Sequence, residues 1–242
     1  MSLRFFVASL CLAGTALLAG CGSAVGIATE ARESALAVED AYDGYSLLVD
    51  AADNRPFWFF ERGNAFSDAQ RQAWTIMEQT ADDLIMKAIQ QGNEKLLLPA
   101  IGNPARISEV LQPSIEAKTH AIALLLEQLE KDESAISSEM LVLLSDQVRQ
   151  GEYVVQNYKR AVRIAEIAWQ RGYPEAARQL TRIYNSANDA ENAYFWGLRC
   201  IGECRGLLHR RDLGVITREL SAGDIQRIQA AATDSSKLRV TF

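Results

Sequence analysis

The clearest pattern in this chain lies in residues 157–204, which read NYKRAVRIAEIAWQRGYPEAARQLTRIYNSANDAENAYFWGLRCIGEC. Two sets of four residues share the offsets 0, 4, 7 and 11: Asn157, Ala161, Ile164 and Ala168, then Asp189, Ala193, Trp196 and Cys200. These offsets place each set on one face of a helix, and the two sets begin 32 residues apart. Small residues at such positions let paired helices approach closely, while larger apolar residues fill the groove between them. An internal period near this length indicates a helical repeat, in which stacked helix pairs bury each other's faces.

The positions between the two sets complete a longer motif. Its members are Ala168, Gly172, Ala176, Leu180, Ile183 and Tyr184, followed by Asp189, Ala193 and Trp196. With this spacing, residues 157–204 resemble a Sel1-like repeat, a relative of the tetratricopeptide repeat. The chain departs from that family at residues 185–188, where Asn-Ser-Ala-Asn replaces the usual Gly-x-Gly-Val loop. The resemblance implies a scaffold that holds another protein in a concave groove, and a generic alanine-rich helical bundle is the alternative.

The remainder of the chain also has a helical pattern. No stretch shows the alternating, β-branched pattern of a strand, and the five prolines fall near predicted helix boundaries. The expected helices cover residues 29–52, 67–91, 107–111, 114–131, 138–150 and one further stretch that begins after Ser221. Residues 67–70, Ser-Asp-Ala-Gln, resemble a capping box. We therefore expect an all-α fold, either a Sel1/TPR-like helical-repeat solenoid or a helical bundle.

The beginning of the chain is typical of an exported lipoprotein. A positive start at residues 1–4 precedes an apolar run at residues 5–18, which is shorter than the roughly 20 residues that span a bilayer. Leu18-Ala19-Gly20-Cys21 closes the run with small residues before a cysteine, as in a cleaved signal peptide. This tetrapeptide resembles the lipobox of bacterial lipoproteins, which implies that Cys21 becomes the lipidated first residue. An ordinary signal peptide followed by an accidental cysteine is the alternative.

These patterns divide the chain into five segments. They are a signal peptide (1–20), the lipidated cysteine with a flexible tether (21–28), an N-terminal helical region (29–131), a Sel1/TPR-like repeat region (132–233) and a C-terminal tail (234–242). Gly22 occupies the position where an inner-membrane retention signal often has Asp, so by resemblance we expect attachment to the outer membrane, facing the periplasm.

The charge of the chain is acidic, with 25 basic and 31 acidic residues and a formal net charge of −6. A nucleic-acid binder would show a clustered basic excess, so we expect no nucleic-acid partner. We expect instead contact with the membrane through the lipid, and a protein partner in the cell envelope.

Aromatic residues are the candidates for partner binding. The most conspicuous cluster is Phe57, Trp58, Phe59 and Phe60, which could form a partner-binding or membrane-touching wedge or a buried connector. Tyr184, Tyr194 and Trp196 form a second candidate group, although some of these residues must belong to the core.

Cys200 and Cys204 are the two thiols left once Cys11 departs with the signal peptide and Cys21 is lipidated. Their spacing places them on one helix face, and a disulfide requires Cα atoms roughly 4.4–6.8 Å apart. We expect a local disulfide. Pairing between molecules, two free thiols and a metal site with His209 are the alternatives, and zinc would need a fourth ligand.

The sequence nominates no catalytic residue. His120 and His209 are the two histidines, and the chain lacks His-Glu-x-x-His, the phosphate-binding Gly-x4-Gly-Lys and Gly-x-Ser-x-Gly. We therefore expect no enzyme, no metal and no cofactor besides the lipid on Cys21. The favoured hypothesis is a lipid-anchored periplasmic adaptor of a secretion, conjugation, pilus or cell-wall assembly. A structural subunit of a multimeric outer-membrane complex and a cell-wall-acting enzyme are the alternatives.

Overall fold

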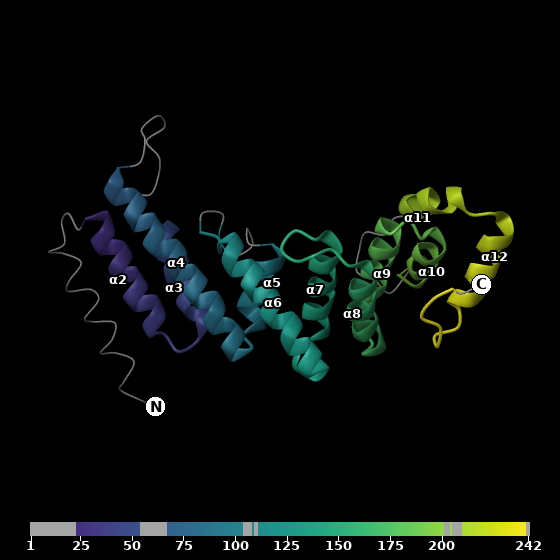
Figure 1. The fold of residues 1–242 in the computed structure, drawn as a ribbon, viewed down its shortest axis with the longest axis horizontal. Coiled ribbons are helices and arrows are strands. Elements are labelled where there is room, and N and C mark those ends of the chain that lie inside the picture. Colours follow the sequence, from purple (N-terminus) through teal and green to yellow (C-terminus); the bar gives the residue numbers. More distant parts are fainter. Residues whose placement is uncertain are drawn as a thin grey trace, which may run out of the picture. The chain divides into compact units, whose positions relative to one another are not determined.

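The computed structural model describes residues 23–53, 67–103, 108, 111–200, 204 and 210–240. Most of these residues are helical and none lies in a strand, so the predicted all-α class is confirmed (Figure 1). The chain forms two compact units, Met1–Leu96 with Pro104–Ser114, and Leu97–Asn103 with Ile115–Phe242. The sequence placed its regional boundary after residue 131, whereas the structure places residues 115–131 in the second unit.

The first unit packs three helices against one another: α2 (Ala24–Ala37), α3 (Ala41–Asp53) and α4 (Asp68–Gln91) (Figure 1). Its core contains Ala28, Ala35, Leu48, Met77, Leu84 and Ile85. The expected capping box is present, because Ser67 and Gln70 exchange side-chain to main-chain hydrogen bonds at the start of α4. Gly92, with φ of 61°, ends α4 in the left-handed region that glycine favours.

Two predictions for this unit are wrong. The flexible tether expected over residues 21–28 is helical from Ala24 onward, since Ser23 caps α2 by accepting a hydrogen bond from the Gly26 N–H (3.1 Å). The single helix expected over residues 29–52 is broken between α2 and α3. At the break, Gln91 of α4 accepts a hydrogen bond from the Ala41 N–H (3.0 Å), and Lys87 donates to the Val38 carbonyl.

The crossing of α2 and α3 depends on Gly44. A Cβ atom added there would lie 2.5 Å from the carbonyl oxygen of Ala35 and 3.0 Å from Leu84 Cδ2. The first of these atoms is backbone, which cannot rotate away as a side chain can. The absence of a side chain at this position therefore allows the two helices to approach.

We expect Gly44→Ala to lower the free energy of unfolding by about 1–3 kcal/mol, the usual range for overpacking. In an open helical position the same change would raise stability by up to about 1 kcal/mol. Gly214→Ala is the matched control, because a Cβ at Gly214 meets no atom within 4 Å. Urea unfolding followed by circular dichroism measures both variants, and a Gly44→Ala chain as stable as the unmodified one would contradict the packing argument.

Helix α5 (Glu94–Gly102) crosses the division between the two units and continues through Pro99. The five prolines were expected near helix boundaries, and Pro99 lies inside a helix instead. Proline has no main-chain N–H, so the helix lacks one hydrogen bond at this residue but is not ended by it. The short helix expected at residues 107–111 lies largely outside the described residues. Leu111 itself is not helical, and its carbonyl accepts a hydrogen bond from the Tyr45 hydroxyl (3.1 Å).

The second unit contains the remaining helices: α6 (Ile115–Lys131), α7 (Ser138–Gln150), α8 (Tyr158–Gln170), α9 (Glu175–Ser186), α10 (Ala190–Cys200), α11 (Arg210–Ile216) and α12 (Ala222–Ala232), with short 3-10 turns η3 (Glu133–Ala135) and η4 (Thr217–Glu219). From α7 to α10, each helix packs against the next (Figure 1). The predicted bounds of α6 and α7, and the predicted start of α12 after Ser221, agree with the structure to within a residue.

The 32-residue repeat has a structural cause. Its two starting residues, Asn157 and Asp189, are both helix caps, accepting hydrogen bonds from the N–H groups of Arg160 (3.0 Å) and Asn192 (3.0 Å). The later positions of both sets are buried: Ala161, Ile164, Ala168, Ala193, Trp196 and Cys200. The repeated spacing therefore marks the cap and the buried face of α8 and then of α10.

Candidate functional site

The second aromatic group predicted from the sequence is mostly core. Trp196 has no exposed surface and Tyr194 is 6% exposed. Trp196 packs edge-to-face against Trp169 of α8, with ring centroids 5.2 Å apart, and the Tyr194 hydroxyl accepts a hydrogen bond from Gln229 of α12 (3.0 Å). Tyr194 and Trp196 are therefore core residues, as some members of this group had to be, and a partner-binding role for them stays a prediction. The helical spacing of these residues in the sequence does not distinguish buried core residues from exposed residues that could bind a partner.

Other predicted site residues cannot be placed. Cys21, His209 and the cluster from Phe57 to Phe60 lie outside the described residues. His120 is described and is exposed on α6, near Ile115, which is 71% exposed. These α6 residues border a shallow surface on one face of that helix.

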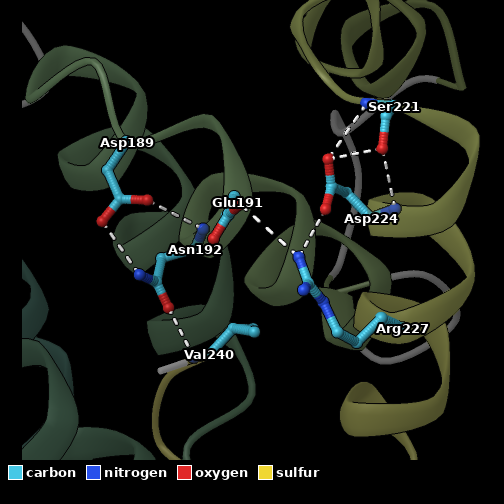
Figure 2. Close-up of polar contacts among 7 residues, drawn as sticks. All are labelled: Asp189, Glu191, Asn192, Ser221, Asp224, Arg227 and Val240. Atoms are coloured by element: carbon cyan, nitrogen blue, oxygen red, sulfur yellow. Dashed lines mark hydrogen bonds and ion pairs between the residues drawn. The ribbon is translucent and has the colours of Figure 1, made fainter. Parts of the chain in front are cut away.

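A polar arrangement that the sequence analysis missed lies at the start of α10. Asn192 is 9% exposed, and its amide nitrogen donates to the Asp189 carboxylate (2.8 Å). A carboxylate only accepts hydrogen bonds, so this contact fixes the orientation of the amide and turns its oxygen toward the C-terminal segment. That oxygen accepts a hydrogen bond from the main-chain N–H of Val240 (2.7 Å), as Figure 2 shows.

The other end of the same face carries Arg199, which is also 9% exposed. Its guanidinium donates to the carbonyl oxygens of Lys237 (2.6 Å), Ala232 (3.4 Å) and Asp234. The guanidinium carbon also lies 4.3 Å from the ring centroid of Phe195 and 5.0 Å from that of Trp196, distances at which a cation is attracted to an aromatic face. Arg199 thus joins the aromatic core of α8 and α10 to the segment that follows α12.

The C-terminal segment is therefore ordered against α10. Residues 234–242 were expected to form a tail, and over residues 234–240 the structure shows a segment bound to α10 instead, with Val240 only 8% exposed. Within this segment, the Ser236 hydroxyl donates to the Asp234 carboxylate (2.6 Å) and lowers the pKa of Asp234, and the charge of Arg199 acts in the same direction.

Helix α12 is attached to α10 by charge as well as by packing. Arg227 lies 3.8 Å from the Glu191 carboxylate and also pairs with Asp224, which belongs to the capping box that starts with Ser221 (Figure 2). Ile228, on the same helix, is fully buried. These contacts hold the helix from which the C-terminal segment departs.

A half-buried acidic group lies beside the same segment. Burial raises the pKa of Glu166 on α8, whereas the charge of Arg239 opposes that rise. The Oε1 atom of Glu166 is buried and makes no hydrogen bond within the described residues. Burial, together with the charge of Glu166, also raises the pKa of Tyr184 to about 12. Tyr184 is the member of the predicted aromatic group that keeps part of its surface exposed.

The raised pKa of Glu166 has a measurable consequence for stability. The folded state holds this proton more tightly than the unfolded state, so the contribution of Glu166 to stability falls as the pH rises from its ordinary pKa of 4.5 through the folded value. We expect Glu166→Gln, which cannot ionise, to gain stability relative to the unmodified chain between pH 4 and pH 7. Urea unfolding at both pH values measures this difference. Glu219→Gln, at an exposed carboxylate, controls for the loss of one negative charge, and a Gln variant that loses relative stability with rising pH would refute the assignment.

The structure joins Cys200 and Cys204 by a disulfide, with Cα atoms 5.0 Å apart. The bond lies at the C-terminal end of α10, where Cys200 is 3% exposed. No group of three or more residues in the described ranges could hold a metal ion, and none of the described helices is long and apolar enough to cross a membrane.

Comparison with models of known families, with curated protein sequences and with solved structures gave no match. The resemblance of residues 157–204 to a Sel1-like repeat therefore stays a prediction from the sequence.

Proposed function

We propose that this chain is a lipid-anchored adaptor of the bacterial envelope, in which a Sel1/TPR-like arrangement of α7 to α10 holds a segment of a partner protein. The observation that carries the proposal is the face of α10 formed by Asn192 and Arg199, which bind main-chain groups of the chain's own C-terminal segment. Such contacts are the means by which a helical scaffold holds a peptide, and they perform no reaction.

The anchoring part of the proposal rests on the sequence of residues 18–21. A diacylglyceryl group on Cys21 would add two acyl chains, and each buried CH2 contributes about 0.8 kcal/mol to membrane affinity. Two chains give stable attachment where one gives only marginal binding. The adaptor would then be held at the periplasmic face of the outer membrane.

We expect Cys21→Ala to move the protein from the membrane fraction to the soluble fraction and to remove the lipid mass from its N-terminal peptide. Cys11→Ala is the matched control, because Cys11 belongs to the predicted signal peptide and should leave the lipid in place. Cell fractionation and mass spectrometry of the N-terminal peptide check both variants. A Cys21→Ala protein that stays in the membrane fraction would contradict the anchor.

The experiment that tests the adaptor is crosslinking of the tagged chain in cells, followed by mass spectrometry of the captured proteins. One dominant envelope partner, captured by the unmodified chain and reduced with Cys21→Ala, supports the proposal. An abundant, folded protein that captures no enriched partner would refute it and favour the structural or enzymatic alternatives.

A further inference from the structure

The C-terminal segment is bound to α10 through its main chain. Three hydrogen bonds join the two: Arg199 donates to the carbonyls of Asp234 and Lys237, and Asn192 accepts from the N–H of Val240. Arg199 also donates to the carbonyl of Ala232, the last residue of α12. Main-chain groups are the same in every residue except proline, which has no N–H. Another polypeptide segment could therefore make the same contacts.

The two α10 residues bind opposite ends of the segment. Asn192 and Arg199 are seven positions apart, which is about 10.5 Å along a helix that rises 1.5 Å per residue. Arg199 binds the carbonyls of Asp234 and Lys237, between which the chain makes a turn, and Asn192 binds Val240 after a bend at residues 238–239. The bound chain therefore runs antiparallel to α10, and the face accommodates a short segment that contains a turn.

The surroundings of this face indicate which side chains such a segment should carry. The Val240 side chain is buried, so that position requires an apolar residue. Arg239 precedes it and acts electrostatically on Glu166. The resident segment nonetheless leaves the buried Oε1 of Glu166 without a hydrogen bond. A basic residue that reached this oxygen would bind the site better than the resident segment does.

From this geometry we infer that the α10 face formed by Asn192 and Arg199 binds a short, turn-containing segment of the partner, with an apolar residue preceded by a basic one, and that Asp234–Val240 is a tethered competitor which such a segment displaces. The inference rests on the proposed function, because it specifies the chemistry of the adaptor's partner. Tethering gives the resident segment an effective concentration on the order of millimolar, so it occupies the face until a better ligand arrives.

The test uses the full chain and a fluorescent peptide with the sequence of residues 234–240, whose binding is followed by anisotropy. Val240→Pro in the protein removes the N–H that Asn192 accepts and leaves α10 intact. Loss of one hydrogen bond weakens the resident segment about threefold to tenfold, so the peptide should bind this variant more tightly than the unmodified chain by that factor. Adding Asn192→Ala to Val240→Pro should weaken peptide binding again.

A peptide with proline in place of its final valine is the matched probe, and it should bind less tightly than the valine peptide. Thermal unfolding of each variant shows that the fold is retained. The inference is overturned if folded Val240→Pro protein binds no peptide at millimolar concentration, or if Asn192→Ala leaves the binding unchanged. If crosslinking still captures an envelope partner in that case, the adaptor function stands and only the identity of the binding face is lost.

Discussion

Trp196→Ala is expected to destabilise the protein by about 3–5 kcal/mol, the usual cost of removing a large aromatic side chain from a core. Trp196 has no exposed surface, and its ring contacts Trp169 at 5.2 Å and Phe195 at 5.4 Å between centroids. The substitution would leave a cavity and remove the ring contact between α8 and α10. Urea unfolding monitored by circular dichroism measures the loss.

Trp196→Phe provides the matched comparison. The indole Nε1 of Trp196 is buried and makes no hydrogen bond within the described residues, so phenylalanine removes an unpaired donor together with part of the ring. We expect Trp196→Phe to cost clearly less than Trp196→Ala. Equal losses in the two variants would contradict this expectation, and a small loss in both would show that Trp196 is not a core residue.

Arg199→Met is expected to release the C-terminal segment and to lower the free energy of unfolding by about 1.5–3 kcal/mol, the range for hydrogen bonds to a charged group. The variant keeps an apolar stem over Phe195 and Trp196 but loses the donors to the carbonyls of Asp234 and Lys237. Arg199→Lys should be nearly as damaging, because a lysine cannot reproduce the planar array of donors.

Hydrogen exchange measured by mass spectrometry locates this effect. The main-chain N–H groups of residues 233–240 should exchange much faster in Arg199→Met than in the unmodified chain, while those of α4 in the other unit should not change. Arg182→Met is the control, because Arg182 is an exposed arginine on the neighbouring helix α9. Unchanged exchange of the C-terminal segment in Arg199→Met would contradict the role assigned to that guanidinium.

The parts of the fold that the sequence predicted well are those determined locally. The caps Ser67, Ser137, Asn157 and Ser221 accept hydrogen bonds from N–H groups three residues onward, and the left-handed glycines 92 and 151 end their helices. Each of these signals lies within one turn of the boundary that it sets. Local chemistry was therefore sufficient to identify most of the helices in the described residues.

The parts that it missed depend on contacts between distant residues. The break between α2 and α3 is stabilised by Lys87, which is 49 positions from Val38, and the contact of Asn192 with Val240 spans 48 positions. One signal for the site was present in the sequence, because Arg199 places a charge three residues after Trp196 in an otherwise apolar stripe. The partners of Arg199 are main-chain carbonyls, which every residue has, so the sequence pattern could not identify them.

The break between α2 and α3 also constrains the order in which the first unit can fold. Residues 29–52 have the pattern of one continuous helix, and the side chains that contact the break belong to the last turns of α4. The chain as far as Gln91 must therefore be present before the turn at Val38 has these native contacts. Until then, the break has only its local cap, in which Asp40 accepts a hydrogen bond from the Asp43 N–H (3.0 Å), so the last turns of α4 complete the α2–α3 hairpin.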